Sequence, residues 1–326
     1  MVLYPLKFRC IYREKVWGGD KLYSVFDRVI DREKIVGESW ELSSMGNNLS
    51  VVSNGFLKGN NIQELIEVYM GDIVGDRVYE KFGIEFPLLF KFIDSAERLS
   101  VQVHPDDEVA LQRHKAYGKT EMWYVVDASE HSQIYSGFNR DLDFDELETR
   151  LFNRNFVEVL NVVLAKKGDV FFLPAGRVHA IGRELLIAEI QQISDVTYRI
   201  YDWGREFNPD IQREMHVELA RDVIDYKACK SCRTQYTAEE NSATPLVSCK
   251  YFTTNLLSFT EKTERHYTEL DSFVVYMCVE GKAELVCDGE AMETVVIGET
   301  VLIPAICDSV IIIPEQNVKL LEVYIP

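Results

Sequence analysis

An eight-residue pattern occurs twice in this chain, and it constrains the fold more than any other feature of the sequence. Gly168-Asp-Val-Phe-Phe-Leu-Pro-Ala175 is echoed 130 residues later by Gly298-Glu-Thr-Val-Leu-Ile-Pro-Ala305. Each copy has a glycine, an acid, a run of mostly β-forming residues and then Pro-Ala, which is typical of a turn that leads into a strand. The repeat predicts two copies of one β-domain.

Other segments show helical rather than β-type patterns. Apolar residues recur at helical spacing in 61–82 and in about 141–160, which predicts a helix in each segment. Asn208-Pro-Asp is expected to open a further helix that runs to about Ile224. We therefore expect a mainly β protein with helical additions. The predicted limits are a first domain at 1–226, a polar linker at 227–243 and a second domain at 244–326.

Composition limits the classes of partner. The formal charge of −18 argues against a nucleic-acid surface, because phosphate backbones are bound by basic patches. The same charge argues against adsorption to anionic lipid, and no apolar run approaches the ~20 residues of a membrane helix. A few local Lys or Arg residues are enough to hold a small anion. We expect a small-molecule ligand, no nucleic acid and no membrane; self-association is not readable from the sequence.

The termini and the cysteines indicate the compartment. The N-terminus lacks the basic and apolar regions of a signal peptide. The seven cysteines are scattered and odd in number, which is typical of free thiols in a reducing cytoplasm. Cys229-Lys-Ser-Cys232 is given no role, because a structural zinc site of this type needs a second such pair. A cytoplasmic protein is expected.

Candidate metal ligands first appear in Leu99-Ser-Val-Gln-Val-His-Pro-Asp-Asp107. Side chains alternate between the two faces of a strand, so Ser100, Gln102 and His104 share one face. A half-buried strand with its polar face in solvent is the simpler interpretation of this stretch alone. Polar residues further along the chain favour a metal site over this simpler interpretation.

Two later strands supply the remaining candidate ligands. Glu121 lies on the predicted strand that begins near Gly118, and His179 follows a turn at the end of the strand after Gly168. Two imidazoles, a carboxylate and an amide oxygen form a site for a first-row divalent metal with open positions. The second copy offers no histidine near Ser309, the position that corresponds to His179, so the first copy is predicted to carry the chemistry.

Four motifs, in order along the chain, resemble the type I mannose-6-phosphate isomerases in their short bacterial form. Trp17-Gly-Gly19 and Pro87-Leu-Leu-Phe-Lys91 match upstream of these motifs, so the resemblance covers roughly the first 210 residues. The motifs are Leu99–Asp107, Gly118-Lys-Thr-Glu-Met-Trp-Tyr124, Pro174-Ala-Gly-Arg-Val-His-Ala180 and Ser194-Asp-Val-Thr-Tyr-Arg199.

The resemblance implies a fold, a cofactor and a reaction. It implies two jelly-roll, cupin-like β-domains and one zinc ion per chain. The implied activity is aldose–ketose isomerisation between mannose 6-phosphate and fructose 6-phosphate through an enediol(ate). The implied zinc ligands are Gln102, His104, Glu121 and His179.

The resemblance also assigns catalytic and substrate-binding residues. It implies catalytic roles for Lys119 and Arg199, with Asp195 beside them. Arg199 would stabilise the developing oxyanion, while the base that moves the proton is Lys119 or Asp195, and the sequence does not choose between them.

The phosphate end of the substrate is assigned less directly. Ser100 and Lys91 match positions that the family associates with the phosphate. The long forms of the family carry a further basic residue in a Leu-Thr-Pro-Lys setting after the catalytic arginine. This chain reads Ile200-Tyr-Asp-Trp-Gly-Arg205 instead, so Arg205 is the candidate replacement.

Two other functions compete with this one. A different metal-dependent cupin enzyme, such as an iron dioxygenase, would usually offer more imidazoles and less amide oxygen. A non-catalytic sugar-phosphate-binding cupin would keep the pocket without needing Lys119, Arg199 and the metal ligands together.

Overall fold

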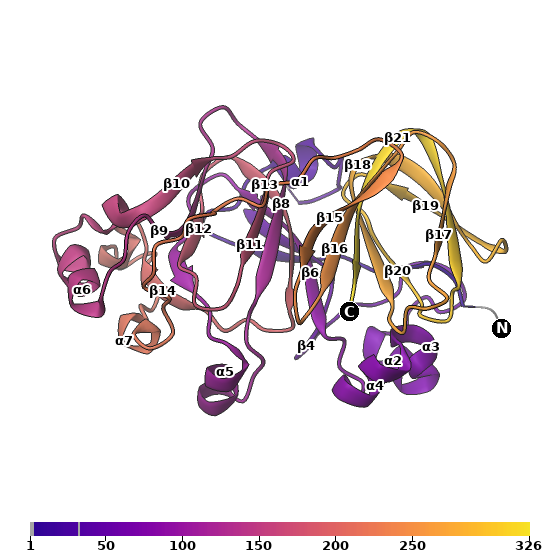
Figure 1. Cartoon of the computed structure of the whole chain (residues 1–326), viewed down its shortest axis with the longest axis horizontal. Coiled ribbons are helices and arrows are strands. Elements are labelled where there is room, and N and C mark those ends of the chain that lie inside the picture. The colour runs from indigo at the N-terminus through magenta and orange to yellow at the C-terminus, as the bar shows by residue number, and fades with distance from the viewer. Residues whose placement is uncertain (1–2, 32) are drawn as a thin grey trace. The chain divides into compact units, whose positions relative to one another are not determined.

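β-Strands are the main regular structure in the computed structural model, which describes residues 3–31 and 33–326 (Figure 1). Contacts divide it into two compact units. The first combines the described residues up to Ile11 with 39–92 and 235–326, and the second combines 12–38 with 93–234. Helices are few and short, which confirms the predicted class of a mainly β protein with helical additions.

Two sheets hold the strands of the second unit, and β2, β3 and β6 of the larger one also include residues of the first unit. The five-stranded sheet has the order β10-β9-β12-β7-β14, and the six-stranded sheet has the order β11-β8-β13-β6-β3-β2. Their strands are β2 (Ile11–Glu14), β3 (Val36–Leu42), β6 (Leu88–Ser95), β7 (Val101–Val103), β8 (Glu121–Ala128), β9 (Gln133–Phe138), β10 (Leu160–Leu164), β11 (Val170–Leu173), β12 (His179–Ile181), β13 (Leu185–Gln192) and β14 (Tyr198–Tyr201).

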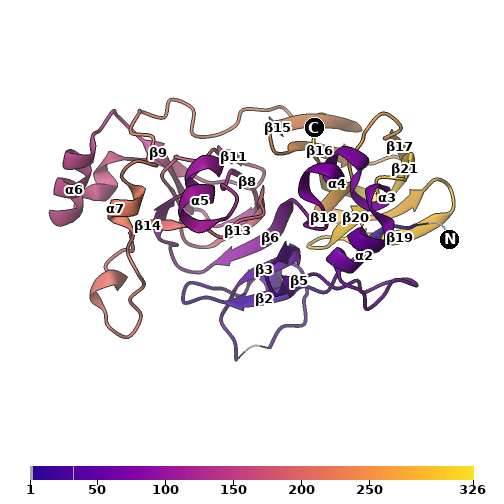
Figure 2. The same ribbon diagram turned by 90° about the horizontal axis from the view of Figure 1, so that it is seen from below.

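Short helices connect the strands of the second unit, and Figure 2 shows α5, α6 and α7 around them. Every residue of β13 is buried, including the charged Glu189. A charged side chain in such a strand must be paired with an opposite charge or a hydrogen-bond donor in the interior. The helices are α1 (Lys21–Ser24), α5 (Asp107–His114), α6 (Phe144–Phe152) and α7 (Val217–Ala220), with 3-10 turns η1 (Phe156–Val159) and η2 (Arg205–Phe207).

The first unit contains an eight-stranded sheet of order β1-β20-β18-β21-β16-β15, in which β17 and β19 also pair with β21 and β18. The small hairpin β4–β5 stands apart from this sheet. The strands are β1 (Leu6–Lys7), β4 (Ser44–Met45), β5 (Asn48–Leu49), β15 (Ser242–Ser248), β16 (Thr253–Phe259), β17 (Thr263–His266), β18 (Val274–Cys287), β19 (Ala291–Val296), β20 (Thr300–Ile303) and β21 (Ser309–Tyr324).

Three short helices replace the single helix predicted over 61–82. They are α2 (Ile62–Tyr69), α3 (Gly71–Val74) and α4 (Asp76–Phe82). The chain turns at Met70 and Gly75, whose φ angles are 47° and 93°, a backbone region that interrupts a helix. A side chain at Gly75 would lie 2.6 Å from the carbonyl oxygen of Asp271, so only glycine fits where the chain turns against the loop before β18.

Two other helix predictions need correction. The pattern over 141–160 yields α6 and η1 with a turn between them. The helix predicted from Asn208 to Ile224 is wrong over its first half: only α7 is α-helical there, and residues 212–216 have no regular structure. His216 N donates to Arg199 O of β14 instead.

The backbone confirms that the two copies of the sequence pattern build the same β-element. In the first copy, Gly168 N donates to Val125 O and Val125 N donates to Asp169 O. In the second, Gly298 N donates to Cys278 O and Cys278 N donates to Glu299 O. The equivalence of Val125 with Cys278 makes Trp123 the counterpart of Tyr276.

Both copies pair this aromatic residue with a buried glutamate. Trp123 is paired with Glu189 and Tyr276 with Glu322. The Trp123 indole donates to Glu189 Oε2 at 2.8 Å, whereas Glu322 accepts two bonds from Arg265, both at 3.0 Å. The second copy thus neutralises its interior carboxylate with an ion pair.

The contact-based division after Thr234 falls inside the predicted linker 227–243. It also groups residues 39–92 with the C-terminal strands. The domain limits drawn from the sequence stay a prediction.

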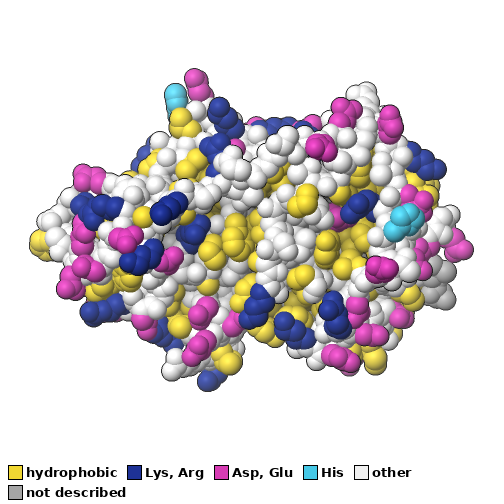
Figure 3. Space-filling model, in the orientation of Figure 1, with side chains coloured by type: hydrophobic (Ala, Val, Ile, Leu, Met, Phe, Trp, Pro, Cys, Tyr) yellow, Lys and Arg dark blue, Asp and Glu magenta, His cyan; other side chains and the backbone are white. Residues whose placement is uncertain are grey.

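None of the helices in the described part of the chain is long and apolar enough to cross a membrane. On the face drawn in Figure 3, acidic and basic side chains are interspersed.

Because Arg265 and Glu322 form an ion pair in the second copy, mutation of Arg265 should strongly reduce stability. Glu322 is fully buried and also accepts from Tyr267 and Asn255. Removing Arg265 leaves this carboxylate without its cation, which costs about 3 kcal/mol for a buried pair. We expect Arg265→Met to lower the free energy of unfolding by about that amount in denaturant titrations.

Lys282→Met is the matched control, because the Lys282–Glu315 pair is exposed on both sides and exposed pairs contribute less than about 1 kcal/mol. Equal losses of unfolding free energy in the two variants would contradict the stabilising role of the Arg265–Glu322 pair.

Candidate functional site

One group of metal-binding side chains is found among the described residues, and it consists of His104, Glu121 and His179. All three are buried, and their ligand atoms lie within 4.8 Å of one another. Glu121 Oε2 lies 3.5 Å from His104 Nε2, and Glu121 Oε1 lies 3.2 Å from His179 Nε2. The group can hold a metal ion.

Backbone carbonyls orient both imidazoles. His104 Nδ1 donates to Val196 O at 2.9 Å, and His179 Nδ1 donates to Arg177 O at 2.8 Å. A carbonyl oxygen only accepts, so each Nδ1 carries the proton and each Nε2 keeps its lone pair toward Glu121. Second hydrogen bonds of this kind fix the ring and tautomer of metal-bound histidines, so the donor set fits a divalent metal.

The register of the five-stranded sheet adds three polar residues to the same face. His179 is paired with Gln102 on one side and Ser136 on the other, and Gln102 is paired with Arg199. Directly opposed residues project to one face of a sheet. Gln102 Nε2 lies 3.4 Å from His179 Nε2, so turning this amide places its carbonyl oxygen toward the other ligands.

Lys119 approaches the same carboxylate from a tightly held turn. Its ammonium lies 3.1 Å from Glu121 Oε2, and the side chain is 6% exposed. The turn is held on both sides of Lys119, because Gly118 N donates to Asp107 Oδ1 and Thr120 N donates to Gln192 Oε1. The Lys119 and Glu121 side chains therefore meet on one side of the strand.

Burial and the charges around Glu121 shift two pKa values. Burial alone would lower the pKa of Lys119, but Glu121 and Glu189 raise it above its ordinary value. Burial lowers the pKa of His179 to about 4, and the charge of Lys119 acts in the same direction. At neutral pH, Lys119 is an ammonium ion and His179 is a neutral imidazole, the form that binds metals.

Arg199 and Ser100 lie together beside this group. Arg199 Nε donates to Ser100 Oγ at 3.3 Å. Burial lowers the pKa of Arg199, and the neighbouring Arg213 adds to this effect. Since Arg199 is paired with Gln102 in the sheet, its guanidinium lies on the same face as the candidate ligands.

The other three predicted residues are placed differently. Arg205 binds Asp202, with Nη2 2.8 Å from Oδ1. Asp195 is exposed in the connection between β13 and β14, and its carboxylate has no hydrogen bond or ion pair with a described residue. Lys91 belongs to the first unit, where it is buried and its ammonium lies 5.4 Å from the ring centroid of Trp40.

Two residues of the site were not singled out from the sequence. Glu189 is buried, receives the Trp123 bond described above and raises the pKa of Lys119. Its signal was an acid within a strand of otherwise mostly apolar residues. Ser136 is fully buried, and its hydroxyl has no hydrogen-bond partner among the described residues. No sequence signal marks Ser136, because its place depends on strand register.

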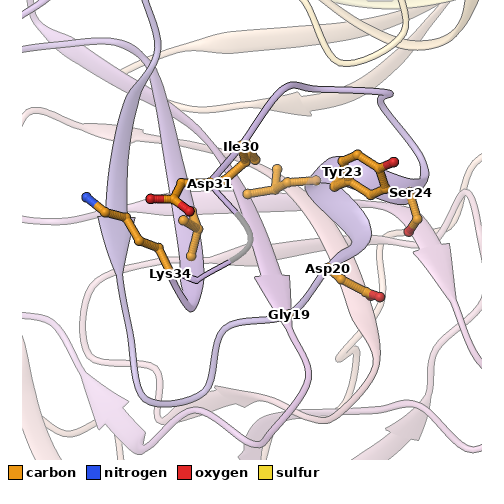
Figure 4. Close-up of a pocket in the computed structure, with 9 residues that line it drawn as sticks. Gly19, Asp20, Tyr23, Ser24, Ile30, Asp31 and Lys34 are labelled. Carbon is orange, nitrogen blue, oxygen red and sulfur yellow. The ribbon is translucent and has the colours of Figure 1, made fainter.

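A separate pocket of about 290 Å³ lies between α1 and residues 30, 31, 34 and 36 (Figure 4). Figure 4 shows Asp31 and Lys34 on one side of it and Asp20, Tyr23 and Ser24 on the other. None of the predicted site residues lines this pocket.

Comparisons with known proteins agree with this geometry. Residues 5–141 match the family described as phosphomannose isomerase type I, catalytic domain. Mannose-6-phosphate isomerase ManA of Bacillus subtilis is 34% identical over 310 residues, which cover 93% of this chain and 94% of that protein. Mannose-6-phosphate isomerase of Streptococcus mutans is 36% identical over 250 residues, which cover 76% of this chain and 77% of that protein.

A solved structure extends the likeness to the whole fold. The crystal structure of the mannose 6-phosphate isomerase from Bacillus subtilis aligns with a TM-score of 0.85 at 27% identity, covering 99% of each chain. This match confirms the expected cupin-like β fold. The relatives and the fold together identify the chain as a member of the type I phosphomannose isomerase family.

Proposed function

We propose that this chain is a zinc-dependent isomerase that interconverts mannose 6-phosphate and fructose 6-phosphate through an enediol(ate). The observation that carries the proposal is the buried group of His104, Glu121 and His179, with Lys119 and Arg199 on its borders. The names of the relatives in Bacillus subtilis and Streptococcus mutans support the substrate.

Zinc is the proposed metal, with Gln102, His104, Glu121 and His179 as its ligands. Nitrogen and oxygen donors of this kind suit zinc, and a catalytic zinc keeps positions open for substrate. When bound, zinc would supply Lewis-acid stabilisation of negative charge on the substrate oxygens.

The remaining residues are proposed to move the proton and balance charge. Arg199 provides a fixed cation for the oxyanion that develops when a proton leaves the carbon next to the carbonyl. Lys119 and Asp195 are the candidates for proton transfer. Lys119 is favoured by its position, because it is buried beside Glu121 whereas Asp195 is exposed. Its ammonium must lose a proton before it can act as the base, because Glu121 raises its pKa.

The substrate phosphate is proposed to contact Ser100, Lys91 and Arg205. Ser100 is supported by its hydrogen bond with Arg199. A phosphate that is held away from the reacting carbons supplies binding energy that orients the sugar for reaction.

Removing the metal should abolish the reaction. We expect chelation to eliminate conversion of mannose 6-phosphate, zinc to restore it, and His104→Ala to remain inactive when zinc is added. The measurement is a coupled assay of fructose 6-phosphate formation, together with the zinc content of each sample.

His131→Ala is the matched control, since His131 is exposed and should keep full activity. Full turnover by the metal-free protein, or none by the zinc-loaded wild type, would overturn the proposed function.

Lys119 and Asp195 should differ in their effect on the chemical step. Losing a group that transfers a proton lowers kcat by about 100- to 10,000-fold. We expect Lys119→Met to fall in this range with its zinc content unchanged, and Asp195→Asn to lose less than about 10-fold. Steady-state kinetics would reveal the reverse order if Asp195 moves the proton.

A further inference from the structure

Asp202 holds two arginines side by side. Its side chain is fully buried, and its carboxylate accepts from both Arg205 and Arg213. Arg205 Nε and Nη2 donate to Oδ1 at 3.1 and 2.8 Å. Arg213 Nε donates to Oδ2 at 3.0 Å and its Nη2 to Oδ1 at 2.5 Å. Both guanidinium groups are thereby fixed in position.

The segment that carries Arg213 also fixes Arg199. Arg199 Nη1 donates to Glu214 O at 2.6 Å, and Arg199 N donates to His216 Nδ1 at 3.2 Å. His216 N donates back to Arg199 O at 2.8 Å. Residues 213–216 thus run along β14 and place a third guanidinium beside the other two.

The three arginines keep unused hydrogen-bond donors. Nη2 of Arg199 and Nη1 of Arg205 and of Arg213 have no acceptor among the described residues. The only carboxylate hydrogen-bonded to these guanidinium groups, within the described part of the chain, is Asp202. The cluster therefore carries an excess of positive charge in a chain whose net charge is −18.

We propose that Arg205 and Arg213 bind the phosphate group of the substrate, and that Asp202 is the positioning residue that holds both of them for it. Two partly buried guanidinium groups with unused donors match the charge and the terminal oxygens of a phosphomonoester dianion. Arg199, which is bonded to residues 214 and 216, joins this pair to the metal-binding face through its pairing with Gln102. The inference rests on the proposed function; it adds Arg213 to the substrate-binding residues and Asp202 as a positioning residue.

The test combines kinetics with binding of inorganic phosphate. A hydrogen bond to a charged group contributes about 1.5–3 kcal/mol, which corresponds to roughly a 10- to 100-fold change. We expect Arg213→Gln to raise KM for mannose 6-phosphate and the calorimetric Kd for inorganic phosphate by that factor, with a smaller effect on kcat. If Arg213→Gln folds poorly, Arg213→Lys takes its place in the test. This variant keeps the positive charge against Asp202, and it should show an intermediate loss of affinity for phosphate.

Arg140→Gln is the control, because Arg140 makes an exposed ion pair with Glu146 on α6 and should leave KM and Kd unchanged. Three results would overturn the inference: no effect of either Arg213 variant on phosphate binding, a fall in kcat at constant KM, or phosphate binding that persists undiminished in saturating mannose 6-phosphate.

Failure of the proposed function gives a different result. If zinc-loaded wild type binds inorganic phosphate and Arg213→Gln does not, while mannose 6-phosphate is not converted, the anion site stands and the isomerase assignment falls.

Discussion

The candidate site of the second unit depends on the buried negative charge of Glu121. An isolated carboxylate in this position would be strongly destabilising, so its surroundings must supply positive charge. Lys119 supplies one cation at 3.1 Å, whereas the two imidazole Nε2 atoms face the carboxylate with lone pairs. The rings face it because carbonyls of Val196 and Arg177 hold their Nδ1 atoms. A carboxylate flanked by two such ring nitrogens can hold a metal ion, and a bound cation would balance the remaining charge.

The two copies of the β-element stabilise a buried glutamate in different ways. Glu189 and Glu322 occupy corresponding positions, each paired with an aromatic residue on the neighbouring strand. In the copy with Glu322, the carboxylate is bound by Arg265 and by the Tyr267 hydroxyl. The copy with Glu189 instead has Lys119 and the two histidines that can bind a metal ion. One fold can therefore carry chemistry in one copy and an ion pair in the other, because function resides in side chains rather than in the fold.

Short-range sequence patterns predicted much of this site. The residues that enter it through long-range pairings could not be predicted from the sequence. Strand alternation placed Gln102 and His104 on one face, since side chains in a strand have a strict period of two. The sequence repeat predicted the shared β-element. The role of Asp202 was not predicted, because it depends on Arg213, 11 residues away, in a segment whose sequence favoured a helix. Ser136 enters the site only through the register of β9 with β12, which sequence alone does not reveal.

The central claim is that His104, Glu121 and His179 form a metal centre. X-ray diffraction from zinc-loaded crystals above and below the zinc absorption edge tests it most directly. The account predicts one anomalous peak per chain, about 2.0–2.2 Å from the Nε2 atoms of both histidines and from a Glu121 oxygen. The absence of a peak at this position, or a single peak at Cys229 and Cys232 instead, would contradict it.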